Sequence, residues 1–76
     1  SRNRARSAAS SARVEAARLG AATARERFAA GTATQLDVTL AQRDALAAEL
    51  TRVSTRAELA ADRALLRLAA GREVAP

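Results

Sequence analysis

The sequence predicts an all-α fold, an antiparallel two-helix hairpin that resembles a short coiled coil. Three observations predict it. The chain has 76 residues, 23 of them alanine, which favours helix more than any other residue. Its single proline, Pro76, is the last residue. Its two long Ala-rich segments are interrupted only once, around Gly31 and Thr34. One hairpin over residues 1–76 follows, with a helix at about 4–29, a turn at 30–34, a helix at about 35–70 and a tail at 71–76.

The first helix has one apolar stripe with regular spacing. Its members lie three or four residues apart, as on one face of a helix: Val14, Ala17, Ala21, Ala24 and Phe28. Gly20 is the only glycine within this segment and costs roughly 1 kcal/mol relative to alanine, so we expect close packing at that point. Phe28, the only aromatic residue of the chain, is expected to anchor the turn from below.

The turn carries a stop signal followed by a start signal. Gly31 stands where a helix ends in a left-handed residue, and it lacks the Cβ that would penalise that conformation. Thr34 is the predicted N-cap, whose hydroxyl accepts a hydrogen bond from the next helix. Asp37, three residues later, can reach back to the Thr34 N–H and complete a capping box. Its negative charge also suits the positive end of the helix dipole.

The second helix carries two apolar seams, which predicts two packed neighbours where an isolated hairpin needs one. Gly71 is expected to stop this helix, and Pro76 follows at a short distance. The first seam, broken by Arg43 and Ser54, consists of Leu36, Leu40, Ala47, Leu50, Ala57, Ala61, Ala64 and Leu68. The second consists of Leu46, Val53 and Ala60, with Leu59 and Leu66 offset from it.

The composition argues against several classes of function. The chain lacks His, Cys, Lys and Tyr, so the usual general bases, nucleophiles and metal ligands are missing, and we expect no enzyme activity, cofactor or metal site. The net charge of +5 makes nucleic-acid binding a function to be considered. The basic start, residues 2–6, resembles the arm of a leucine-zipper protein, but Arg6, Ser7 and Ser11 stand where that arm has two alanines and a basic residue. No apolar run reaches the roughly 20 residues that cross a bilayer, and alanine faces bind membrane surfaces poorly.

The turn and its flanks resemble the periplasmic hairpin of TolC-like outer membrane factors, the exit ducts of Gram-negative type I secretion and efflux systems. The pattern is an aromatic residue, two residues, glycine, a short polar stretch, an apolar residue and Asp-Val, here Phe28, Gly31, Leu36 and residues 37–38. Residues 14–18, 40–43 and 65–71 are similar to the approaching helix, the segment after the turn and the end of the returning helix. The glycine start and the Leu-Ala-Ala-Gly ending look more like the second of the family's two hairpins.

The resemblance implies a part of a larger channel. Three subunits would form a periplasmic barrel of twelve helices, so each hairpin would have neighbouring hairpins of the same channel as partners. The tip would dock the hairpins of a periplasmic adaptor through Ala30, Gly31, Thr32 and Ala33. Asp37 would fall at the pore constriction, where a ring of carboxylates favours cations. The segment would lie in the periplasm, with no nucleic acid as partner and no direct membrane contact.

Three positions differ from the family's best-known pattern. Phe28 and Ala33 stand where a tyrosine and an arginine hold neighbouring hairpins shut, and Leu40 stands where a second acid often follows the first. A gate held by packing is therefore expected. The alternative function is the coiled-coil hairpin of a periplasmic adaptor itself. Adaptor hairpins usually show one strong heptad seam between β segments, whereas this sequence shows two alanine-rich seams.

Overall fold

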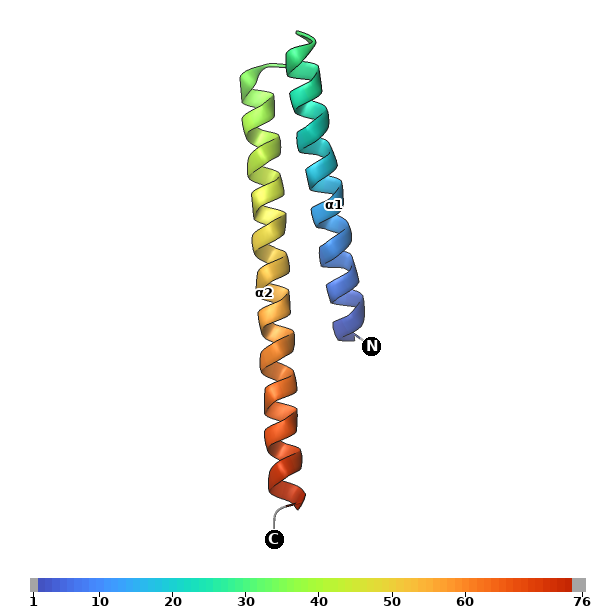
Figure 1. Cartoon of the computed structure of the whole chain (residues 1–76), viewed down its shortest axis with the longest axis vertical. Helices are drawn as coiled ribbons and strands as arrows, with labels where there is room; N and C mark the ends of the chain where they lie inside the picture. The colour runs from blue at the N-terminus through green and yellow to red at the C-terminus, as the bar shows by residue number, and fades with distance from the viewer. Residues whose placement is uncertain (1, 75–76) are drawn as a thin grey trace.

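The computed structural model describes the backbone of residues 2–74 and the side chains of residues 2–72. It consists of two antiparallel α-helices, α1 (Arg2–Ala29) and α2 (Gln35–Val74), joined by one tight turn (Figure 1). This confirms the predicted all-α hairpin. The molecule measures 70 × 18 × 12 Å, and its radius of gyration is 19.0 Å. A compact domain of this length would have a radius of gyration of about 11 Å, so the chain is a rod.

The helix limits agree with the prediction at the turn and differ from it at the far end. α1 ends at Ala29 and α2 begins at Gln35. However, α2 continues to Val74, so the prediction that Gly71 stops this helix is wrong. The positive φ of glycine that ends a helix occurs at Gly31 and at no other described residue. Gly71 keeps right-handed helical geometry, which weakens the helix locally but does not end it. Residues 75–76 of the predicted tail lie outside the described residues.

The two helices meet along one row of residues on each, which we call the inner seam. Its members alternate at spacings of three and four, the heptad pattern of coiled-coil packing. Val14, Ala21 and Ala48 are its buried apolar residues. Small side chains let the helix axes approach to the short end of the usual 8–10 Å range. The seam consists of Ser7, Ser10, Val14, Ala17, Ala21 and Ala24 on α1 and Val38, Ala41, Ala45, Ala48, Arg52, Thr55 and Leu59 on α2, all buried or half-buried.

The inner seam confirms the stripe predicted for α1 and corrects the seams predicted for α2. The stripe residues from Val14 to Ala24 pack against α2. On α2, by contrast, the predicted seams meet α1 only at Leu59, which is half-buried; their other members are exposed. Hydropathy ranks leucine above alanine, so the sequence pattern pointed to the leucine faces. Close helix approach instead favours the face that carries Ala41, Ala45 and Ala48.

Gly20 does not mark close packing within this hairpin, contrary to our prediction. A Cβ at this position would meet no atom within 4 Å outside the local helix.

The chain as a whole exposes more surface than a folded monomer of its mass. Its accessible surface is 6044 Å², whereas a folded monomer of 7.9 kDa typically exposes about 4,400 Å². The excess of roughly 1,600 Å² is about the area that a standard protein–protein interface buries.

Candidate functional site

The tip of the hairpin is built by backbone hydrogen bonds that close the end of α1. The Gly31 N–H donates to the Phe28 carbonyl at 3.0 Å, and the Thr32 N–H donates to the Arg27 carbonyl at 2.8 Å. This pair of bonds is the Schellman motif, and it requires a left-handed residue at Gly31, whose φ is +79°. The Thr32 hydroxyl also donates to the Arg27 carbonyl at 3.2 Å. The predicted stop signal is confirmed.

The start of α2 carries the predicted capping box. The Thr34 N–H donates to Asp37 Oδ2 at 2.8 Å, and the Asp37 N–H donates to the Thr34 Oγ1 at 3.1 Å. The backbone bond from Thr34 and then its side chain hold the pKa of the Asp37 carboxyl below its usual value. Asp37 is exposed and therefore stays ionised at neutral pH. Stop and start signals together fix the direction in which α2 returns along α1.

The structure brings the predicted tip residues together at one end of the rod. Ala30, Gly31 and Thr32 are exposed there, and Ala33 is half-buried. Phe28 is 48 % exposed, so in the single hairpin it is only partly covered. Next to the tip, an open groove of about 680 Å³ runs along α1. Its lining consists of Ala16, Leu19, Gly20, Thr23, Ala24, Arg27, Thr32, Ala33 and Asp37.

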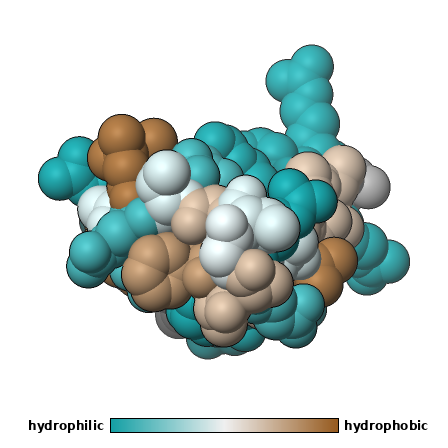
Figure 2. Space-filling model, turned by 90° about the horizontal axis from the view of Figure 1, so that it is seen from above, coloured by the Kyte–Doolittle hydropathy of each residue, from teal (hydrophilic) through white to brown (hydrophobic). Residues whose placement is uncertain are grey.

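Most of the large apolar side chains of α2 lie outside the inner seam, which contains only Val38 and Leu59 of them. Those outside the seam are between 52 % and 70 % exposed, and they are Leu36, Leu40, Leu46, Leu50, Val53, Leu65, Leu66 and Leu68. We call this set the outer leucines. Seen along the long axis of the molecule, apolar patches reach the surface at the edge of the outline, with polar side chains between them (Figure 2). Single exposed leucines are ordinary on protein surfaces, but rows of them along one helix are typical of interaction surfaces.

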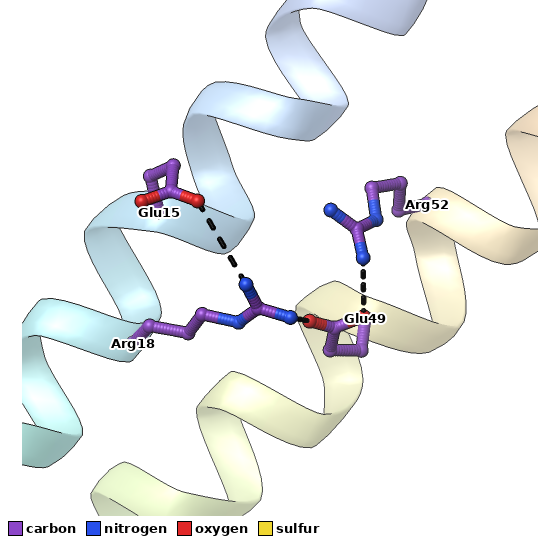
Figure 3. A network of polar contacts seen from close by, with 4 residues as sticks. All are labelled: Glu15, Arg18, Glu49 and Arg52. Atoms are coloured by element: carbon purple, nitrogen blue, oxygen red, sulfur yellow. Dashed lines mark hydrogen bonds and ion pairs between the residues drawn. The ribbon is translucent and has the colours of Figure 1, made fainter.

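An ion-pair network crosses the hairpin halfway along its length (Figure 3). Arg18 reaches from α1 to Glu49 on α2, and it also lies 3.8 Å from Glu15. Glu49 accepts a second bond, at 2.8 Å, from Arg52, which stands in the inner seam. The Arg52 Nε is buried and has no hydrogen-bond partner within the part of the chain that the structure describes. A polar residue at a seam position specifies register at some cost in stability, and this network holds the two helices in one alignment.

Two rows of mostly charged residues, which the sequence analysis did not identify, follow one side of the hairpin. Residues at seven-residue steps on α1 face residues at seven-residue steps on α2, and we call them the charged flank. Arg6 binds Glu58 at 2.7 Å, and Arg27 and Asp37 line the same groove at the tip. The seven-residue spacing of both rows is a sequence signal from which the charged flank could have been predicted. The flank consists of Arg6, Arg13, Gly20 and Arg27 on α1 and Asp37, Asp44, Thr51 and Glu58 on α2.

Two further findings bound the chemistry of these surfaces. Among the described residues, no cluster of three or more acidic side chains could hold a metal ion. Within residues 2–74, neither helix has a stretch apolar enough to cross a bilayer.

Comparison of the chain with protein-family models, with curated proteins and with solved structures found no match in any of the three.

Proposed function

We propose that this hairpin is the periplasmic tip hairpin of a TolC-like outer membrane channel, part of an export duct that docks a periplasmic adaptor. In this proposal the chain contributes two of the twelve helices of a homotrimeric barrel. Its neighbours along the barrel wall are other hairpins of the same channel. Its role is passive: it lines a conduit for type I secretion or efflux, and its tip meets the hairpins of the adaptor.

The observation that carries the proposal is the presence of two apolar faces on α2. One face, formed by Ala41, Ala45 and Ala48, packs on α1. The other face carries Leu36, Leu40 and Leu50 and has no neighbour within the described chain. A helix in the wall of a barrel has one neighbour on each side and needs both faces. The rod shape and the excess of exposed surface support the same arrangement.

The geometry of the tip supports the docking part of the proposal. The Schellman motif and the capping box order the apex through its own backbone, so it can present a fixed surface to a partner. Ala30, Gly31 and Thr32 are exposed there and small enough for close contact. In a trimer, Asp37 would repeat around the axis as three carboxylates and favour cations. In the single hairpin the hydrogen bonds from Thr34 hold the pKa of Asp37 below its usual value, which favours the charged form.

A chimera tests the proposal. Residues 2–74 replace the second hairpin of a trimeric TolC-like channel, and trimer formation and drug efflux are measured in cells that lack their own channel. We expect the chimera to form trimers. Changing both Leu40 and Leu50 to Gln should abolish trimers, because the outer face loses its apolar contacts. The matched control, in which both become Met, keeps apolar volume and should retain trimers.

The docking role is tested separately from assembly. Ala30→Glu places a charge at the exposed apex, so we expect trimers to remain and efflux to fall. Ala12→Glu, on an exposed position of α1 far from the tip, is the control for added charge. A chimera that stays monomeric, or trimers in which Ala30→Glu transports as well as the unsubstituted chimera, would count against the proposed channel or its docking tip respectively.

A further inference from the structure

We infer that the charged flank holds a binding site for a tetrahedral oxyanion, a phosphate or sulfate group, between Arg6 and Arg13. This site is independent of the proposed channel function. It lies toward the open end of the hairpin, away from the tip. A cavity of about 270 Å³ marks it, and its lining residues are Arg6, Ala9, Ser10, Arg13, Thr51 and Thr55. Two guanidinium groups and three hydroxyls thus border one hollow.

One of the residues that line this cavity carries a buried, unpaired hydroxyl. Ser10 is 8 % exposed, and its Oγ has no hydrogen-bond partner among the described residues. Buried polar groups are nearly always paired, so an unpaired one indicates a missing partner. Thr55, across the inner seam, is equally buried and borders the same cavity. An oxyanion accepts hydrogen bonds from hydroxyls, and Ser10 and Thr55 are the two hydroxyl residues that the fold buries beside this cavity.

The charges around the cavity favour an anion. At its outer end Arg6 is held by Glu58 at 2.7 Å. At its inner end Arg13 has no acid within 4 Å in the described part of the chain, because the flank carries Thr51 where neighbouring steps carry acids. Asp44 borders Arg13 only in a second cavity, on the side toward the tip. Thr51 therefore leaves one positive charge uncompensated and adds a hydroxyl beside it.

The donor set matches a tetrahedral oxyanion better than other small anions. Arginine presents paired N–H donors that fit two oxygens of a phosphate at once. Hydroxyls on both helices can reach the remaining oxygens from the opposite side. A halide would leave most of these directed donors without an acceptor. The same group can arrive as free phosphate or as the headgroup of an anionic phospholipid, and both share this chemistry.

The test is a titration of the ¹⁵N-labelled chain with inorganic phosphate, at pH 7 and constant ionic strength set by NaCl. We expect saturable shifts of the amide signals of Ser10, Arg13, Thr51 and Thr55. Arg13→Gln should weaken binding at least about tenfold, since a charged hydrogen-bonding group is lost. Arg25→Gln removes the same charge from an exposed position of the same helix outside the charged flank and should leave binding unchanged.

A second variant keeps the test valid if Arg13→Gln disturbs the helix. Ser10→Ala places a better helix former at a buried position, so circular dichroism should show an intact helix while phosphate binding falls several-fold. Sedimentation with phosphatidylglycerol vesicles, compared with phosphatidylcholine vesicles, distinguishes the source. Binding to the anionic vesicles that Arg13→Gln abolishes assigns a headgroup, and binding of phosphate without it assigns the free ion. Shifts that spread over all arginines and follow ionic strength alone would overturn the site.

Discussion

In the half of the hairpin nearer the tip, the inner and outer faces of α2 differ in the size of their side chains: alanines pack on α1, and leucines lie on the exposed face. On the inner face Ala41, Ala45 and Ala48 pack against α1. On the outer face Leu40 and Leu50 are mostly exposed. Apolar burial stabilises in proportion to area, by roughly 25 cal/mol per Å². Most of the apolar area that α2 could bury therefore remains exposed in the single hairpin, and the interface between the two helices is formed largely by small side chains.

The comparison predicts a large difference between two adjacent alanines of α2. Ala48 lies in the inner seam and is 2 % exposed, whereas Ala47 is exposed. Ala48→Leu should destabilise the hairpin by about 1–3 kcal/mol, because the added volume forces the helices apart. Ala47→Leu should change stability by less than about 0.5 kcal/mol. Thermal unfolding followed by circular dichroism measures both, and equal effects would mean that the two faces are not distinct.

Two glycines extend the comparison, one in the turn and one on an uncovered face of α1, and the same substitution should have opposite effects at them. Gly31→Ala should cost about 1–2 kcal/mol, since φ is +79° there and a Cβ is penalised in the left-handed region. Gly20→Ala should instead stabilise the chain by about 0.5–1 kcal/mol, because a Cβ at that position meets no atom within 4 Å. Urea unfolding of the two variants should move the midpoint in opposite directions. A loss of stability from Gly20→Ala would reveal a close neighbour on that face.

The smallest expected effect is the pH dependence of the capping box. Because the folded pKa of Asp37 lies below its ordinary value of 3.8, the contribution of this carboxylate to stability is present above that pH. It is lost as the pH falls through the folded pKa. Asp37→Asn should remove this part of the acid dependence, whereas Asp44→Asn, outside the capping box, should leave it. Melting curves between pH 6 and pH 2 compare the three chains, and identical acid profiles would exclude a capping role.

The polar half of the inner seam explains why the sequence did not show which face of α2 packs against α1. Toward the open end the seam contains Ser7, Ser10, Arg52 and Thr55. These residues are not apolar, so they interrupt the apolar periodicity of the seam. The leucines of α2 give a stronger apolar pattern on other faces. The arginine is tolerated because Glu49 pairs with it and also reaches Arg18 on α1. Such pairing depends on the alignment of two helices and leaves no short-range signal.

The residues of the turn determined the hairpin by themselves. Gly31, Thr34 and Asp37 act through bonds that span at most five residues, so their types and spacing were sufficient to predict where α1 ends and α2 begins. Only the tertiary structure decided which face of α2 meets α1, that Arg6 reaches Glu58, and that a cavity of about 270 Å³ lies beside Arg13. Those contacts join residues up to 52 positions apart and depend on the rotation of each helix about its axis. That rotation is selected by how closely the two backbones can approach, a property of both helices together.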